Sequence, residues 1–175
     1  CHVLRYAPAY VKAKELLAEG KIGRLVAIDL LEPVGNWHQA HSYVRGNWRN
    51  RALSTPMIMA KCCHDLDLIQ DFVGSKCRSV SSMGSLAYFK PEFKPEGAAD
   101  RCTQCKYMES CVYSAKKVYV DMWKDQGSPA NLSPFSLVSD AYPLTEEALW
   151  EAIEKSPYGR CAFACDNDVV DNQTT

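Results

Sequence analysis

Three ionisable side chains, Lys61, His64 and Asp65, crowd the stretch 61–74, KCCHDLDLIQDFVG, at the start of a predicted helix. At about 100° per residue they fall on one side of that helix. A histidine there can remove the proton of a hydroxyl group at neutral pH. His64 and Lys61 are therefore candidate catalytic residues, with Asp65 beside them. The alternative is the solvent-exposed edge of an ordinary helix, with incidental charges.

The segment 35–55 has little periodicity and many aromatic and basic side chains, which is typical of a loop at a binding surface. Its rings could stack on the face of a sugar while its polar groups bind hydroxyls. The alternative is that the tryptophans anchor the loop to the core while the arginines face water. The predicted substrate-binding residues are Arg5, Tyr6, Trp37, His38, His41, Arg45, Trp48, Arg49 and Asp65.

Three of the nine cysteines form a C-x2-C-x5-C pattern at Cys102, Cys105 and Cys111. The short C-x2-C turn lets two thiolates converge on one ion, and Zn²⁺ takes four such ligands in a tetrahedron. A fourth ligand could be Cys161 or Cys165, and we favour Cys161 because it lies deeper in an apolar run. We predict a structural zinc site. An iron–sulfur cluster, free thiols or a disulfide are the alternatives.

Strands mixed with helices and separated by long connections predict an α+β fold, with a Cys-rich loop insertion at 90–107. Gly20 is expected as the C′ residue of the first helix and Thr145 as the N-cap of the last. We expect a single substrate-binding and oligomerisation domain over residues 1–175. The predicted strands are 2–6, 24–34, 77–89 and 160–165, and the predicted helices are 8–19, 56–74, 110–124 and 145–156.

Charge and cysteine usage narrow the class of protein. The formal net charge is −1, which argues against a nucleic-acid groove or an anionic membrane partner. No apolar run approaches the ~20 residues of a spanning helix. An odd number of cysteines, with Cys62 and Cys63 adjacent on a predicted helix, favours reduced thiols and a cytoplasmic protein. Because the chain begins at Cys1 and runs straight into a strand, we expect a fragment.

Two stretches carry a resemblance to the Gfo/Idh/MocA family of NAD(P)-dependent oxidoreductases. The stretch 2–28, HVLRYAPAYVKAKELLAEGKIGRLVAI, resembles the junction after that family's nucleotide-binding domain, including its G-x-I-G turn. The stretch 62–74, CCHDLDLIQDFVG, is similar to the family's histidine-bearing helix, G-V-H-D-I-D-L followed by a hydrophobic run and glycine. The likeness covers residues 1–90, and the cysteine-rich remainder matches only a subgroup of the family.

The sequence also departs from the family pattern. The Rossmann G-x-G-x-x-G/A motif and the Glu-Lys-Pro motif of the family are not found, because Gly20 and Gly23 follow a predicted helix instead of a strand. The family often has an aspartate four residues before its histidine, and Ala60 occupies that position here. The resemblance is therefore to the second, substrate-side domain.

The resemblance implies the substrate-binding half of an enzyme that transfers hydride to or from a hydroxyl carbon of a sugar, polyol or related compound. It also implies a mostly antiparallel open sheet with helices on one face, a homo-oligomer, and NAD or NADP held mainly by a domain that is missing here. It is this family resemblance that favours the catalytic role for His64 over the exposed edge of an ordinary helix. An NAD-dependent glycoside hydrolase and a non-catalytic structural module are the alternatives.

We predict that the 175-residue chain alone binds no nicotinamide cofactor with micromolar affinity, because no glycine-rich turn joins a predicted strand to a predicted helix. Isothermal titration calorimetry with NADH and NADPH checks this. Micromolar binding to the isolated chain would contradict it.

Overall fold

A computed structural model describes residues 2–175 and groups them into two units, each with its own internal contacts. Unit 1 comprises the described residues up to Pro33 together with Met57–Met83 and Thr174–Thr175. Unit 2 comprises Val34–Pro56 and Gly84–Gln173. Two units can belong to one domain, so the single domain expected over residues 1–175 stays a prediction.

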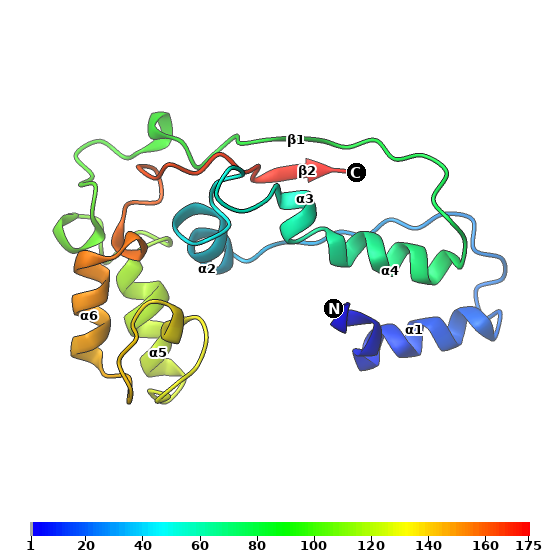
Figure 1. Cartoon of the computed structure of the whole chain (residues 1–175), viewed down its shortest axis with the longest axis horizontal. Helices are drawn as coiled ribbons and strands as arrows, with labels where there is room; N and C mark the ends of the chain where they lie inside the picture. The colour runs from blue at the N-terminus through cyan, green and yellow to red at the C-terminus, as the bar shows by residue number, and fades with distance from the viewer. Residues whose placement is uncertain (1) are drawn as a thin grey trace. The chain divides into compact units, whose positions relative to one another are not determined.

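Helices and turns outnumber strands among the described residues (Figure 1). The α-helices are α1 (Pro8–Ala18), α2 (Asn36–His38), α3 (Met57–Ala60), α4 (Cys63–Val73), α5 (Met122–Asp125) and α6 (Glu146–Lys155). Two π-helical segments, Gln39–Arg45 and Lys116–Asp121, follow α2 and precede α5 respectively. Short 3-10 turns lie at Val3–Tyr6, Pro91–Phe93, Cys102–Gln104, Phe135–Leu137 and Pro157–Gly159.

The strands β1 (Met83–Ser85) and β2 (Asn172–Thr174) form a two-stranded sheet. The N–H of Asp171 donates to the Ser85 carbonyl at 3.1 Å, and Ser82 lies 2.8 Å from Thr175 through their hydroxyls. Residue numbers thus rise in one strand as they fall in the other, so the strands are antiparallel. The α+β class is confirmed, with a much smaller sheet than expected.

Most of the predicted strand residues lie outside the sheet. Val3–Tyr6 is a 3-10 turn, the segment 24–34 forms no strand, and only Met83–Ser85 of the third predicted strand is a strand. In the fourth, Arg160 makes an isolated antiparallel bridge with Arg101. A β-rich sequence becomes a strand only where a neighbouring strand accepts and donates its hydrogen bonds. Within residues 2–175, β1, β2 and that bridge are the only such pairings.

The capping residues of the helices were predicted correctly. Gly20 has φ +70° and its N–H donates to Leu17, while the N–H of Lys21 donates to Leu16 at 3.1 Å, which is a Schellman motif. The hydroxyl of Thr145 accepts the N–H of Ala148 at 3.2 Å and begins α6.

The long helix predicted over 56–74 is interrupted between α3 and α4. The spacing of Ile58, Cys62, Leu66, Ile69 and Val73 predicts a buried stripe on that helix. This is wrong in part, because Val73 is 47% exposed and the fully buried residue of α4 is Leu68, at 1%. A break in a helix resets its phase, so a stripe drawn across the break does not stay on one face.

Unit 2 has the larger apolar core. Tyr119, Phe135, Leu149 and Ile153 are each fully buried, and α6 packs against the π-helical segment Lys116–Asp121. Figure 1 shows α5 and α6 side by side. A second cluster joins Val44, Phe89, Ala162 and Phe163. These two clusters fix the elements that carry the predicted loop residues and the cysteines.

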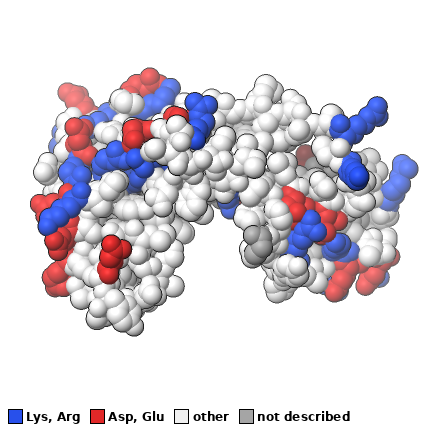
Figure 2. Space-filling model, in the orientation of Figure 1, with Lys and Arg blue, Asp and Glu red and all other residues white. Residues whose placement is uncertain are grey.

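Charged side chains of both signs lie next to one another on the face shown in Figure 2, without an extended patch of one sign. None of the helices formed by residues 2–175 has the length and apolarity needed to cross a bilayer.

The carboxylate of Asp171 holds the turn after β1. Its oxygens accept the N–H groups of Ala87, Tyr88 and Phe89 at 2.8, 2.7 and 3.1 Å. Burial by itself would raise the pKa of Asp171, but the three N–H donors outweigh it and the pKa lies below its ordinary value. The ionised form is therefore the one that stabilises this turn.

We expect Asp171→Asn to lower the free energy of unfolding of unit 2 by about 2 kcal/mol at pH 7, since it removes hydrogen bonds to a charged group. Because the folded pKa is depressed, the contribution is complete above the unfolded pKa of about 4 and is lost as pH falls through the folded value. All four tryptophans, Trp37, Trp48, Trp123 and Trp150, lie in unit 2, so fluorescence-detected urea unfolding measures it.

The exposed Asp140→Asn is the matched control and should change little. An Asp171→Asn protein as stable as the parent at pH 7 would refute the role of this carboxylate.

Candidate functional site

His64 lies in the first turn of α4, in unit 1, and its ring nitrogen Nδ1 is buried without a hydrogen-bond partner among the described residues. The ring of His2 meets it edge-on, with centroids 5.8 Å apart. The N–H of His64 donates to the Lys61 carbonyl at 3.2 Å, which fixes the backbone of this turn. A buried polar atom without a partner is uncommon in folded proteins and calls for an explanation.

Asp67 lies one turn further along α4 and binds Arg5. Its two oxygens accept Nε and Nη2 of Arg5 at 2.7 and 2.6 Å, a bidentate pair. The hydrogen bond from Arg5 is the main cause of the lowered pKa of Asp67, against the opposing effect of burial. Asp67 also lies 3.6 Å from Nδ1 of His2. Asp67 therefore stays ionised close to His64.

Lys61 belongs to a second set of neighbouring charged side chains in unit 1. Its Nζ lies 2.8 Å from Oε1 of Glu32, in an ion pair within unit 1. Burial raises the pKa of Asp65, the charge of Glu32 adds to this, and Lys61 and His64 oppose it. Glu32, Lys61, His64 and Asp65 are thus electrostatic neighbours. They provide a cation, two carboxyl groups and an imidazole at one end of α4.

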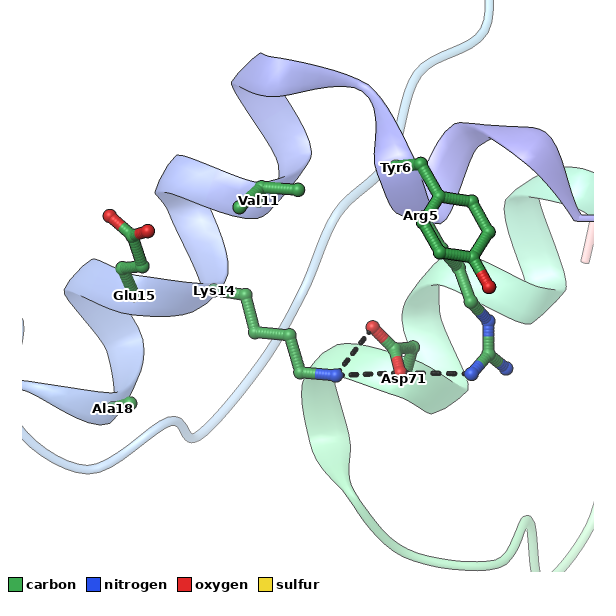
Figure 3. A pocket seen from close by; sticks show the side chains of 7 residues that line it. All are labelled: Arg5, Tyr6, Val11, Lys14, Glu15, Ala18 and Asp71. Atoms are coloured by element: carbon green, nitrogen blue, oxygen red, sulfur yellow. Dashed lines mark hydrogen bonds and ion pairs between the residues drawn. The ribbon is translucent and has the colours of Figure 1, made fainter.

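The first two predicted substrate-binding residues, Arg5 and Tyr6, line a pocket of about 440 Å³ between α1 and α4 (Figure 3). In Figure 3 the side chains of Arg5 and Lys14 converge on Asp71. Nη1 of Arg5 lies 3.1 Å and Nζ of Lys14 lies 2.7 Å from Oδ1 of Asp71. Two cations and a carboxylate therefore line this pocket, and such groups can form hydrogen bonds with a polyhydroxylated ligand.

The loop predicted over 35–55 is helical between Asn36 and Arg45. The π-helical segment Gln39–Arg45 turns His41 and Arg45 into unit 2, where they are 5% and 1% exposed. Gly46 follows this segment directly. Only glycine fits there, because a Cβ would lie 2.4 Å from the His41 carbonyl oxygen. π-Helical segments are rare and occur frequently at functional sites.

His41 and Arg45 have structural contacts of their own. The Nδ1 atom of His41 lies 3.0 Å from the Tyr119 hydroxyl, and its ring stacks on that of Tyr158 at 5.0 Å. Burial lowers the pKa of His41 to about 4, with the charges of His38 and Arg45 adding to the shift. Its imidazole is therefore neutral at pH 7. The substrate-binding role of both residues stays a prediction.

The remaining loop residues lie nearer the surface of unit 2. Trp37 is 38% and Trp48 is 42% exposed, and the rings of Trp37 and His38 stack at 5.2 Å. Nε of Arg49 donates to Asp166 at 2.9 Å, and this hydrogen bond is the largest cause of the lowered pKa of Asp166, about 2. The two tryptophan rings are the surfaces here that a sugar could stack on.

All four predicted zinc ligands line one pocket of about 390 Å³ in unit 2, and all four are free cysteines. Cys165 does not line it, and its thiol donates to the Cys161 carbonyl at 3.2 Å. Burial raises the pKa of the Cys161 thiol, which is thus neutral at pH 7 without a metal. Among residues 2–175 no group of three or more His, Cys, Asp or Glu side chains is already arranged to hold a metal ion.

The predicted residues thus fall into three sets. One set lies in unit 1 and comprises Arg5, Tyr6, Lys61, His64 and Asp65. The other two sets, the predicted residues of the segment 35–55 and the four predicted zinc ligands, lie in unit 2. Three charged residues of unit 1, Glu32, Lys14 and Asp71, were not predicted from the sequence. A signal existed for Glu32, because it is an acidic residue at the end of the apolar run 25–31.

Comparison with known proteins gives two matches. Residues 14–120 match the family model of the Gfo/Idh/MocA proteins described as "Oxidoreductase family, C-terminal alpha/beta domain". A protein of Bacillus subtilis (strain 168), named "Putative oxidoreductase YteT", is 30% identical over 132 residues, which covers 73% of this chain and 29% of that protein. The chain therefore spans under a third of the length of this relative. No solved structure matches.

The depressed pKa of His41 predicts a stability that falls in acid. Between about pH 6.5 and 4 the unfolded chain binds a proton that the folded chain excludes, so unit 2 should lose up to about 3 kcal/mol over this range. His41→Gln should remove this part of the pH dependence, as measured by tryptophan fluorescence in urea from pH 4 to 7.5. His2→Gln, a change at an exposed histidine in unit 1, is the control. Identical slopes for His41→Gln and the parent would contradict the assignment.

Proposed function

Because the chain belongs to the Gfo/Idh/MocA oxidoreductase family, we propose that it is the substrate-binding half of an NAD(P)-dependent enzyme. The substrate is a sugar, polyol or related compound with a secondary hydroxyl group. In this reaction the nicotinamide accepts or donates the hydride while the substrate hydroxyl loses or gains a proton. The reduced thiols favour a cytoplasmic enzyme, and we expect a homo-oligomer.

The described residues do not fit the cofactor. Gly20 and Gly23, which have positive φ values, follow α1, and no strand–turn–helix with a glycine-rich turn is present in residues 2–175. Such a turn is what supplies the N–H groups for a dinucleotide phosphate. The cofactor is therefore assigned to a domain outside this chain, and no contact with it is assigned to these residues.

One observation carries the proposed role of this chain: Nδ1 of His64 is buried and has no hydrogen-bond partner among residues 2–175. A ring nitrogen kept from water without a partner costs stability, which is tolerated where a group works in catalysis. The neighbours of His64 support a proton-transfer role, because Asp65 and the ionised Asp67 stabilise an imidazolium formed during the reaction. Lys61 is placed beside it, paired with Glu32.

Substrate binding by Arg5, Tyr6 and the loop residues is part of the proposal. Arg5 and Tyr6 line the pocket of Figure 3, where basic groups can donate to hydroxyls. Arg5 also sets the position of Asp67, so it contributes to the charge beside His64. The exposed rings of Trp37 and Trp48 supply stacking surface in unit 2.

We expect His64→Ala, made in the full-length protein, to lower kcat by about 10²–10⁴-fold, the usual contribution of a general acid–base. His64→Gln should be equally inactive, because the amide is close in size but does not titrate. NADH or NADPH formation with a panel of sugars and polyols measures the rate. The pH profile should lose one limb in both variants.

Gln70→Ala, an exposed position on the same helix, is the matched control and should leave kcat unchanged. A His64 variant that keeps its kcat, or one that unfolds yet stays active when cooled, would show that His64 is structural. Release of free sugar without net NADH formation would favour the glycoside hydrolase instead.

A further inference from the structure

The cysteine pocket of unit 2 brings together two segments that are distant in sequence. Arg101 and Arg160 form an antiparallel bridge, and the N–H of Cys161 donates to the Asp100 carbonyl at 2.7 Å. Cys102 and Cys161 are the next residues along each segment. The sulfur of Cys102 accordingly lies 3.8 Å from the Arg160 carbonyl oxygen.

The C-x2-C turn is formed in the structure. Cys102–Gln104 is a 3-10 turn, and the N–H of Cys105 donates to the Cys102 carbonyl at 3.1 Å. Cys111 follows a second tight turn, in which its N–H donates to the Tyr107 carbonyl at 2.8 Å. All of these thiols line the same pocket as Cys161, and the rest of its lining is mostly apolar and aromatic.

The guanidinium of Arg45 supplies a buried positive charge at this pocket. Arg45 is 1% exposed, and its Nε and Nη2 atoms donate to the carbonyls of Arg160 and Tyr113 at 2.7 and 2.6 Å. No carboxylate of the described residues pairs with it, and its Nη1 has no partner there. A buried charge without a counter-ion is costly. The groups of the pocket that could supply negative charge are the thiols.

Cys102 already accepts hydrogen bonds that suit a thiolate. Nη2 of Arg45 lies 3.6 Å and the N–H of Ala115 lies 3.4 Å from its sulfur. Such donors hold and tune metal-bound thiolates.

We propose that Cys102, Cys105, Cys111 and Cys161 bind one Zn²⁺ as thiolates, with Arg45 as the buried counter-charge. Because the four side chains are not yet arranged around a common centre, Cys105, Cys111 and Cys161 turn toward Cys102, which keeps its hydrogen bonds from Arg45 and Ala115. The metal displaces one proton from each thiol. The site joins the Cys-rich turns to the segment after Arg160, so its role is structural and independent of the proposed dehydrogenase activity.

The experiment uses the full-length protein, purified in the presence of a thiol reductant, with elemental analysis for zinc and iron. We expect about one zinc ion per chain, lost in Cys105→Ser and Cys161→Ser. Cys77→Ser, a change at an exposed cysteine outside the pocket, is the matched control and should keep its zinc. Arg45→Met should weaken zinc binding about 10–100-fold against a competing chelator, and Arg45→Lys by less.

Some serine variants could fail to fold, so the wild-type protein is also tested after chelation. Adding Zn²⁺ alone should protect Cys102, Cys105, Cys111 and Cys161 from alkylation, as mapped by mass spectrometry, and leave Cys77 reactive. A protein without zinc whose four thiols stay reactive after addition of Zn²⁺ overturns the proposal. Iron with the visible absorption of an iron–sulfur cluster overturns the zinc assignment.

Discussion

The buried guanidinium of Arg45 is the interaction on which unit 2 depends. One side chain, at the end of a π-helical segment, donates to backbone carbonyls at Tyr113 and Arg160 and to the sulfur of Cys102. It therefore holds together the stretches around Cys102, Tyr113 and Arg160, which lie in turns and irregular backbone. Because Arg cannot give up its proton in a protein, this charge must be balanced within the fold.

Unit 1 is organised differently, by charge more than by apolar burial. Met57 and Leu68 are its buried apolar residues among those described, whereas Arg5 and Lys14 bind carboxylates on α4. Exposed ion pairs contribute little stability on their own, but a bidentate arginine fixes direction. Through the ion pairs of Asp67 and Asp71, this arrangement positions the turn of α4 that carries His64. None of the residues 2–175 forms a hydrogen bond with Nδ1 of its imidazole.

Local signals in the sequence predicted local features well. The caps at Gly20 and Thr145 were identified because each depends on one residue and its immediate neighbours. Most of the strands were predicted wrongly. An apolar segment with β-branched residues, such as 24–34, does not specify which other segment it pairs with, and a strand forms only when two segments pair. The burial of Arg45 was missed for the same reason. The composition of the segment around Arg45 suggested a surface loop. Its hydrogen-bond partners Cys102 and Arg160 are 57 and 115 positions further along the chain.

The extended, unpaired segment 24–34 has one more consequence. Val26 is 83% and Leu31 is 87% exposed, and the backbone between them lies outside any helix or strand. Proteases bind their substrates in an extended form, and well-ordered helices such as α1 resist them until they unfold. A protease of broad specificity would therefore cleave within this segment, leaving α1 and α4 in separate fragments that the ion pairs of Arg5 and Lys14 still connect.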